Sequence, residues 1–130
     1  PRLRSGERLE DAVAAMDDLG VDVVLLNCSR PEAIDPALPD IARGERTVGA
    51  YANGFTSVAA LAPGVTVDAL EARVDLDPAA YAERARAWVV AGAGVVGGCC
   101  EVGPAHIAEM RRVLLEAGYP IAPPGASARR

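Results

Sequence analysis

Two short apolar runs that each end in cysteine constrain the fold of this chain more than any other feature. They are Val21–Cys28, with the sequence VDVVLLNC, and Ala93–Cys100, with the sequence AGVVGGCC. A shorter run of similar character, Thr47–Tyr51, lies between them. Runs that are apolar almost without interruption are typical of strands buried on both faces, as in a parallel sheet. We therefore predict strands at Val21–Asn27, Thr47–Tyr51 and Gly94–Gly98.

The segments around these strands have apolar residues at helical spacing, which predicts helices. The first helix covers residues 7–19, with Ser5 as its cap and Gly20 as its end. Its buried stripe is predicted to be Leu9, Ala12, Val13, Met16 and Leu19. Two short helical pieces are predicted at Pro31–Ile34 and Pro36–Arg43.

Two longer helices are predicted on either side of the third strand. Asp77 caps one that begins at Pro78 and ends at Gly92, and the other covers residues 104–117. The inward-facing residues of the last helix are predicted to be Ile107, Met110, Val113 and Leu114. Strands that alternate with helices favour an α/β fold in which a parallel sheet has helices outside it.

The length of the chain is enough for one domain, which we place at residues 1–121. The connection from Phe55 to Leu76 has only weak patterns, and connections of this length are often functional lids or binding loops. Residues 122–130 are rich in proline, alanine and glycine and are predicted to be a disordered tail.

Charge and cysteine content exclude several classes of function. The formal net charge is -5 and the basic residues, all of them arginine, are scattered, so no basic surface is available for nucleic acid. No apolar run reaches the length of a membrane span, so no membrane partner is expected. The 3 cysteines are an odd number and a poor basis for a disulfide framework. Free thiols and a cytoplasmic location are expected instead.

The cysteines Cys28, Cys99 and Cys100 lie where predicted strands end. Because the carboxyl ends of parallel strands meet at one edge of a sheet, the three thiols are expected to converge there. Three thiolates can hold one zinc ion and leave its fourth position open, which is the design of a catalytic site. Two alternatives stay open: ordinary buried cysteines, or a strained Cys99–Cys100 disulfide in the absence of metal.

Three segments resemble the conserved motifs of the homocysteine S-methyltransferases. Leu26–Ile34 (LNCSRPEAI) resembles the first cysteine motif of that family, and Val48–Gly54 (VGAYANG) resembles its next conserved segment. Gly97–Ile107 (GGCCEVGPAHI) resembles its terminal signature. The order and spacing of the three segments agree with the family, and the resemblance extends over about residues 3–119.

The resemblance implies a TIM, or (β/α)8, barrel that binds one zinc ion per chain through Cys28, Cys99 and Cys100. It implies an enzyme that transfers a methyl group to the thiol of homocysteine and so forms methionine, a step of methionine biosynthesis. S-methylmethionine or S-adenosylmethionine is the expected methyl donor, and no catalytic residue beyond the zinc ligands is expected. A full barrel has eight strands and about 250 residues. We therefore expect the C-terminal part of one, about three β/α units with the sixth, seventh and eighth strands.

A partial barrel needs a partner that supplies the remaining strands. The expected partner is the missing N-terminal half of the barrel or a second copy of the chain, and the piece alone is not expected to be active. Two alternative functions stay open. One is the homocysteine-binding module of a cobalamin-dependent methionine synthase, and the other is a non-catalytic zinc-binding half-barrel that pairs with a partner.

Other residues near the cysteines have two interpretations each. Asn27 and Asn53 either hydrogen-bond the amino acid substrate or serve turn chemistry at the strand ends. Glu101 either binds an amino group or is a loop charge. His106 is either a fourth zinc ligand or, as we favour, a packing or capping residue in the first turn of the last helix. Tyr51 either contacts the substrate or, as we favour, packs in the core. Tyr81 and Trp88 are expected in the core.

Overall fold

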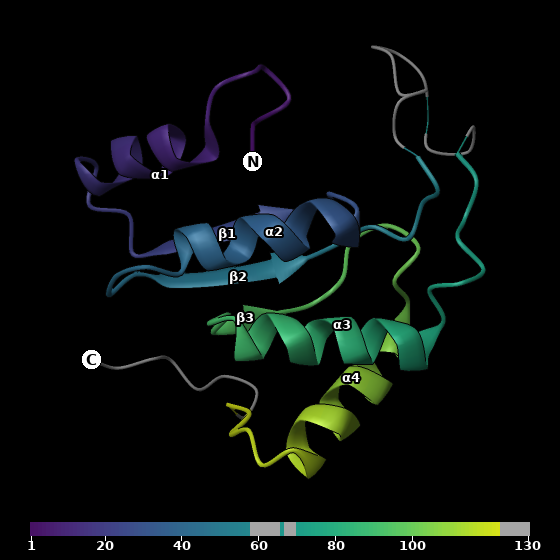
Figure 1. The fold of residues 1–130 in the computed structure, drawn as a ribbon. Coiled ribbons are helices and arrows are strands. Elements are labelled where there is room, and N and C mark those ends of the chain that lie inside the picture. Colours follow the sequence, from purple (N-terminus) through teal and green to yellow (C-terminus); the bar gives the residue numbers. More distant parts are fainter. Residues whose placement is uncertain (58–65, 67–69, 123–130) are drawn as a thin grey trace.

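Three parallel strands form the sheet of this protein, for which a computed structural model describes residues 1–57, 66 and 70–122 (Figure 1). The strands are β1 (Val23–Asn27), β2 (Thr47–Tyr51) and β3 (Val95–Val96), and they lie side by side in the order β1-β2-β3. In the register of the sheet, Val24 is opposite Val48 and Ala50 is opposite Val96. The predicted parallel sheet is therefore confirmed, and all three carboxyl ends meet at one edge.

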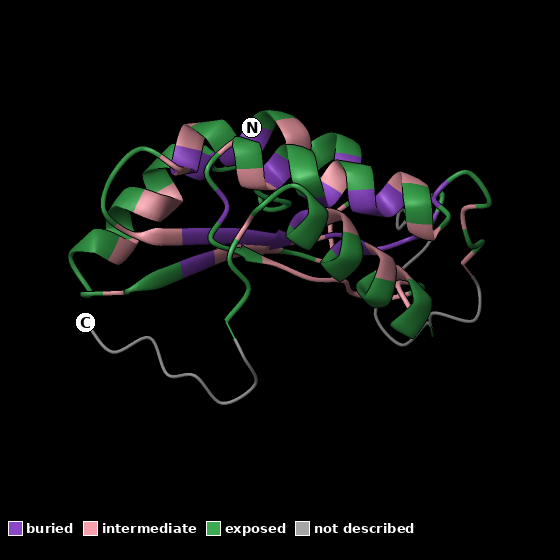
Figure 2. Ribbon diagram, turned by 90° about the horizontal axis from the view of Figure 1, so that it is seen from below, coloured by how far each residue is buried: buried purple, intermediate pink, exposed green. Residues whose placement is uncertain are grey.

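The described residues form four helices: α1 (Leu9–Asp17), α2 (Pro31–Ile41), α3 (Pro78–Val90) and α4 (Pro104–Glu116). Figure 2 shows α1, α2 and α3 on the same side of the sheet, and α4 packs against α3. The α/β architecture expected from the alternation of patterns is thus present. The predicted tail lies outside the described residues from residue 123 onwards, and so does much of the connection 55–76.

Helix α2 corrects the prediction of two short helical pieces. It runs without a break from Pro31 to Ile41, with Pro36 and Pro39 inside it. Proline removes backbone hydrogen bonds from a helix, but the face formed by Ile34, Ala37, Leu38 and Ile41 is buried. Burial of this apolar face holds the helix together across both prolines.

The predicted ends and faces of two other helices are also corrected. The N-cap residue of α1 is Arg8 rather than Ser5, and Leu19 lies beyond its last turn with 77% of its surface exposed. In α4, Met110 and Leu114 are buried as predicted, but Ile107 is 39% exposed. Ile107 lines an apolar groove of about 620 Å³ beside β3, and no described residue fills that groove.

The two faces of the sheet differ in burial, and the core lies on the side of the helices. Its largest buried side chains include Trp88, Tyr81, Ile34, Leu38 and Val48. Side chains alternate between the faces of a strand, and those that point away from this core are more open: Val23 is 44% exposed and Val95 is 39% exposed. The sheet therefore presents apolar side chains on its second face.

Strand β3 is shorter than the predicted strand Gly94–Gly98. Hydrogen bonds to β2 nevertheless continue beyond it, because the N–H groups of Gly94 and Gly97 donate to Val48 and Ala50 at 2.8 and 3.1 Å. The three strands therefore stay together up to the point where the cysteines follow.

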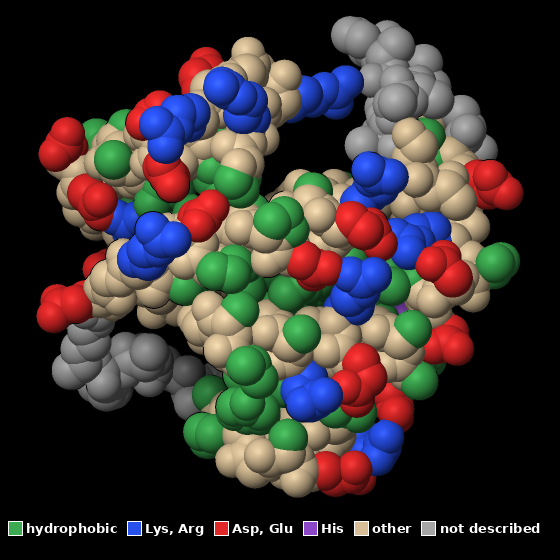
Figure 3. All heavy atoms as spheres, in the orientation of Figure 1, with side chains coloured by type: hydrophobic (Ala, Val, Ile, Leu, Met, Phe, Trp, Pro, Cys, Tyr) green, Lys and Arg blue, Asp and Glu red, His purple; other side chains and the backbone are tan. Residues whose placement is uncertain are grey.

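The surface carries charges of both signs. Figure 3 shows arginine and acidic side chains interspersed over one face of the molecule, without a large patch of either sign. Among the described helices, none combines the length and the apolar character that a membrane crossing requires.

Candidate metal centre

The three cysteines converge at the carboxyl edge of the sheet, as predicted. The Sγ atom of Cys100 lies 3.9 Å from Sγ of Cys28 and 3.8 Å from Sγ of Cys99. All three sulfurs lie within 4.8 Å of one another, and all three are free thiols that are half-buried. In a tetrahedral site with zinc–sulfur distances of about 2.3 Å, neighbouring sulfurs are about 3.8 Å apart. The observed spacing therefore fits a zinc ion.

The end of the central strand brings the two cysteine loops together. The N–H group of Cys28 donates to the carbonyl of Tyr51 at 3.0 Å, and the N–H group of Cys99 donates to the carbonyl of Ala52 at 2.9 Å. The N–H group of Gly54 donates to the carbonyl of Cys100 at 2.8 Å. Residues 51–54 thus lie between the loop after β1 and the loop after β3, and bond to both.

The backbone at the cysteine loops adopts unusual conformations. Cys28 has a φ of 53° and Glu101 a φ of 63°, in the left-handed region that residues other than glycine seldom adopt. Such conformations are held against a local energy cost and cluster at functional sites. Gly98 is required for steric reasons, because a Cβ atom there would lie 2.1 Å from Cγ1 of Val102.

The three thiols affect one another's ionisation. Burial, together with the neighbouring thiols Cys99 and Cys100, raises the pKa of the Cys28 thiol to about 12. Burial acts against ionisation of Cys99 as well, but hydrogen bonds from Cys28 and from the thiol and backbone of Cys100 outweigh it and lower its pKa. Without a cation, the cluster therefore favours one thiolate at Cys99 over a charge at Cys28.

Asn53 is fully buried, with an exposed fraction of 0%, and it is the buried polar residue of the described core. Its Nδ2 atom donates to the carbonyl of Cys28 at 2.6 Å, and its Oδ1 atom accepts the N–H group of Phe55 at 3.0 Å. Its own N–H group donates to the carbonyl of Ser29 at 3.0 Å. Asn53 therefore supports the Cys28 loop, and its contact with a substrate stays a prediction.

Tyr81 lies in the core as predicted, with an exposed fraction of 0%, but its hydroxyl group has a role that no sequence pattern indicated. The hydroxyl accepts the N–H group of Ala52 at 3.1 Å and donates to the carbonyl of Gly97 at 2.7 Å. Burial raises the pKa of Tyr81 to about 12, so the hydroxyl keeps its proton at neutral pH. It joins the ends of β2 and β3 next to Cys99.

His106 lies in the first turn of α4 and acts there as a capping residue, the role that we favoured. The N–H group of Gly103 donates to its Nδ1 atom at 3.2 Å, and Nε2 lies 3.1 Å from the carbonyl of Leu76. Because Nδ1 accepts, the proton is on Nε2, which donates to Leu76. Both nitrogens are thus engaged, and the metal-ligating cluster of the described residues consists of the cysteines without His106.

The remaining predicted residues lie at the rim of the site. Asn27 is exposed at the end of β1, next to Cys28, and Glu101 is exposed next to Cys100. Tyr51 is half-buried at the end of β2. The structure therefore leaves Asn27 and Glu101 accessible to a ligand at the cysteine edge.

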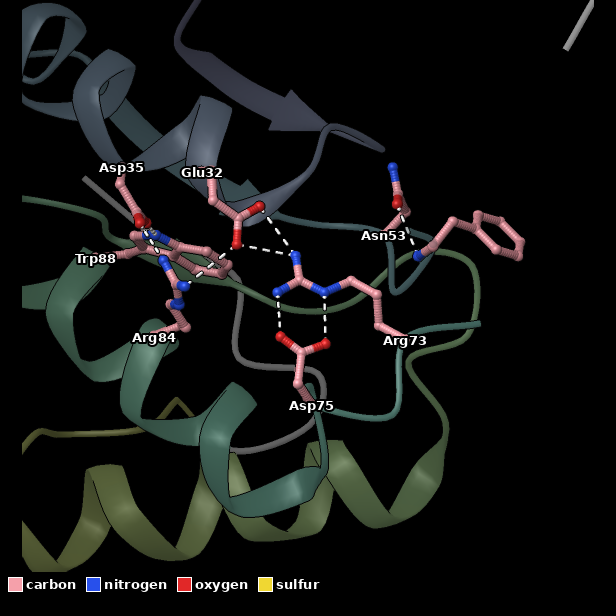
Figure 4. A network of polar contacts seen from close by, with 8 residues as sticks. Glu32, Asp35, Asn53, Arg73, Asp75, Arg84 and Trp88 are labelled. Carbon is pink, nitrogen blue, oxygen red and sulfur yellow. Dashed lines mark hydrogen bonds and ion pairs between the residues drawn. The ribbon is translucent and has the colours of Figure 1, made fainter. Parts of the chain in front are cut away.

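A network of ion pairs joins α2, α3 and the segment before α3, and no sequence pattern indicated it (Figure 4). Both Arg73 and Arg84 bind Glu32 of α2, at 2.9 and 3.2 Å. Arg73 also forms a bidentate pair with Asp75, at 3.0 and 2.6 Å. Burial opposes ionisation of Glu32, but its backbone hydrogen bond and the two arginines lower its pKa. Glu32 is 41 and 52 residues from the two arginines, so no local pattern could reveal these links.

Asp35 extends this network to the aromatic core. It pairs with Arg84 and accepts the indole N–H group of Trp88 at 2.7 Å. The ring of Tyr81 packs edge-on against Trp88 and His106, with ring centroids 5.8 and 5.9 Å apart. A continuous row of side chains therefore runs from α2 through α3 to α4 beneath the cysteine edge.

Comparison with known proteins agrees with the motifs. The family model described as "Homocysteine S-methyltransferase" matches residues 1–114, a range that includes all three cysteines. Among its relatives, "Homocysteine S-methyltransferase 4" of Zea mays is 30% identical over 118 residues. These residues are 88% of this chain but 33% of that protein, so the chain spans about a third of the length of this relative.

Proposed function

This chain belongs to the homocysteine S-methyltransferase family, and on that premise we propose that it carries the metal centre of an enzyme that methylates the thiol of homocysteine and so forms methionine. The metal would be one zinc ion per chain, held by Cys28, Cys99 and Cys100. The observation that carries the proposal is the spacing of the sulfurs. Two separations of 3.8 and 3.9 Å agree with the edge of a tetrahedral zinc–thiolate site, which is about 3.8 Å.

Zinc, when bound, would supply thiol activation, since the metal lowers the pKa of a coordinated thiol and makes a sulfur nucleophile available at neutral pH. The chain itself would supply the negative charge of the three thiolates and hold the substrate sulfur in position among them. Three cysteine thiolates carry more charge than the divalent ion neutralises, so a sulfur held among them stays electron-rich. Such a sulfur can form a bond to the methyl carbon of a positively charged sulfur donor, whose own bond to that carbon breaks and which leaves as a neutral thioether. S-methylmethionine and S-adenosylmethionine are therefore the proposed donors.

Substrate binding is proposed for Asn27 and Asn53. Asn27 is exposed at the end of β1 and would hydrogen-bond the amino acid part of homocysteine directly. Asn53 has an exposed fraction of 0% and already donates to the carbonyl of Cys28. It would therefore act on the substrate through the position of Cys28. The free thiols that this chemistry needs agree with a reducing, cytoplasmic setting.

The three β/α units are proposed to be the last units of a TIM barrel. The strand order β1-β2-β3 follows the chain without reversal, and α1, α2 and α3 lie on one side of the sheet. A doubly wound sheet has helices on both faces, whereas a barrel has them outside only. The apolar side chains of Val23 and Val95 would then face the barrel interior, and about five further units would complete it. These units are the proposed partner, with a second copy as the alternative.

A non-catalytic role is the second candidate function. A zinc-binding half-barrel that pairs with a partner would have the same three cysteines, at the same sulfur spacing. A homocysteine-binding module of a cobalamin-dependent methionine synthase would have them too. Methyl transfer by the assembled barrel separates these candidates, because only the first function gives methionine from a sulfonium donor.

Metal analysis tests the site directly. We expect about one zinc per chain by elemental analysis of the purified protein, and loss of that zinc in Cys28→Ala, Cys99→Ala and Cys100→Ala. Ser29→Ala, next to Cys28, is the matched control and should retain zinc. Full retention of zinc in the triple cysteine variant would disprove the site.

Activity is tested by methionine formation from homocysteine with each proposed donor. The chain is assayed alone and joined to the preceding barrel units of the Zea mays relative. We expect methionine from the joined protein and none after Cys99→Ala. If the joined protein folds and binds zinc but forms no methionine with any donor, the non-catalytic role is favoured.

A further inference from the structure

The hydrogen-bond ladder between β2 and β3 contains a side chain where a backbone group is expected. In a parallel pair, the rungs alternate in direction along the two strands. The N–H group of Gly97 donates to Ala50, and two residues later the N–H group of Cys99 donates to Ala52. The rung between them should join the N–H group of Ala52 to the carbonyl of Gly97. Instead, Ala52 donates to the Tyr81 hydroxyl at 3.1 Å, and this hydroxyl donates to Gly97 at 2.7 Å.

The inserted hydroxyl holds the two strand ends apart at one point. A direct N–H to carbonyl bond spans about 2.9 Å between nitrogen and oxygen, whereas here two consecutive bonds through an oxygen atom occupy the gap. The strands are separated at this one rung, directly before Cys99, and meet again where the N–H group of Cys99 donates to Ala52 at 2.9 Å. Tyr81 cannot withdraw easily, because its ring packs against Trp88 and His106 and its exposed fraction is 0%.

As Tyr81 does between β2 and β3, Asn53 joins the segment after β2 to the loop after β1. Its Nδ2 atom donates to the carbonyl of Cys28 at 2.6 Å, and this cysteine has a left-handed φ of 53°. The carbonyl of a residue in this conformation cannot continue the ladder of β1. A buried amide therefore binds it, and its Oδ1 atom is fixed in turn by Phe55.

We infer that Tyr81 and Asn53, neither of which is a metal ligand, are the positioning residues of the three-thiol centre. Both work through residues 52–54, the segment after β2 that separates the two cysteine loops: Tyr81 binds Ala52, and Asn53 belongs to the segment. Tyr81 sets the distance from this segment to the Cys99–Cys100 loop, and Asn53 sets the conformation of Cys28. The inference rests on the proposed zinc site and adds to it how the sulfurs reach a spacing of 3.8 to 3.9 Å.

The experiment compares Tyr81→Phe and Asn53→Ser with the unaltered chain. Tyr81→Phe removes a single oxygen atom, so Ala52 and Gly97 either bond directly or lose a partner. Asn53→Ser removes the donor to Cys28 and leaves the ladder intact. Tyr119→Phe removes a hydroxyl group from a residue that lines the groove beside Ile107, which no cysteine lines, and is the matched control. Zinc affinity is measured by competition with a chelator, and Co(II) absorption reports the number and geometry of bound thiolates.

We expect both variants to bind zinc roughly 10- to 100-fold more weakly than the unaltered chain, the usual effect of losing a group that orients metal ligands. Their Co(II) spectra should change in the thiolate and ligand-field bands, a change that a general loss of stability would not produce. Tyr119→Phe should change neither. Circular dichroism of each variant verifies folding, and if Tyr81→Phe does not fold, Asn53→Ser decides by the same criteria.

The outcomes separate this inference from the proposed function. If the unaltered chain binds zinc and both variants match it in affinity and in Co(II) spectrum, the positioning role is wrong while the zinc site stands. If the unaltered chain binds neither zinc nor Co(II), the zinc site is wrong and the positioning role is wrong with it.

Discussion

Replacement of Gly98 by alanine is the most direct test of the loop that carries two of the thiols. An added Cβ atom would lie 2.1 Å from Cγ1 of Val102 and 2.5 Å from its Cβ. Carbon atoms in contact are ordinarily about 3.5–4.0 Å apart, so the overlap is about 1.5 Å. Rotation of the valine side chain moves Cγ1 but not Cβ. The backbone of the loop must therefore shift, and with it Cys99 and Cys100.

The expected cost follows from this forced shift. Insertion of a carbon atom into a packed site costs about 1–3 kcal/mol, and we expect Gly98→Ala to reach the upper half of this range. For a chain of this size, that corresponds to a fall in Tm of roughly 5–15 °C. Because the displaced segment carries two ligands, zinc affinity should also fall, by about tenfold or more. Thermal unfolding by circular dichroism and chelator competition measure the two effects.

Gly97 provides a control within the same loop. A Cβ atom at Gly97 would lie 3.7 Å from Cβ of Tyr51, an ordinary contact, so Gly97→Ala should change Tm and zinc affinity little. In a Val102→Gly background, Gly98→Ala should cost much less, because both close atoms are gone. Equal effects of Gly97→Ala and Gly98→Ala, or no rescue in the Val102→Gly background, would refute the steric argument.

The remaining expectations concern the ionisation of the site and its support by α2 and α3. Because burial raises the pKa of Cys28 to about 12, zinc must displace a proton from this thiol when it binds. Zinc affinity should therefore rise by at least about tenfold per pH unit between about pH 6 and 8, and a pH-independent affinity would contradict this. Trp88→Phe removes the 2.7 Å hydrogen bond from the indole N–H group to Asp35 and should lower the free energy of unfolding by about 1.5–3 kcal/mol in denaturant titration. A change below about 0.5 kcal/mol would show that this bond does not stabilise the fold. Arg73→Gln, at a side chain 12% exposed, should cost about 1–2 kcal/mol, whereas Arg43→Gln, at one 73% exposed, should cost under about 0.5. Equal losses in the two variants would show that the Arg73 network adds no more stability than an ordinary surface ion pair.

The sequence predicted the elements that depend on local pattern. The strands and the helices α3 and α4 appear where apolar periodicity and capping residues indicated, and Asp77 caps α3 through the N–H group of Ala80 at 2.8 Å. The family resemblance is confirmed by the family model over residues 1–114. Local pattern was wrong at α2, where the prolines indicated a break. Packing of the buried face of that helix decided the outcome, and such packing is not encoded in any short window.

The cysteine cluster was predictable because the predicted strands are parallel. Parallel strands place their carboxyl ends together, so Cys28 and Cys99–Cys100 had to meet once the sheet was assigned. The supporting residues were not predictable in the same way. Asn53 had the appearance of a turn residue or a substrate contact, and Tyr81 that of ordinary core. Their bonds to Cys28 and Gly97 join positions 25 and 16 residues apart in the chain.

The sequence by itself therefore determined which residues can form strands, which thiols lie at their ends and which family the chain resembles. Only the tertiary structure decided the spacing of the sulfurs, the left-handed conformation of Cys28 and the hydroxyl inserted between β2 and β3. The physical reason is the range of the interactions. Helix and strand patterns arise from neighbours along the chain, whereas sulfur positions depend on hydrogen bonds and packing between segments that meet only after folding.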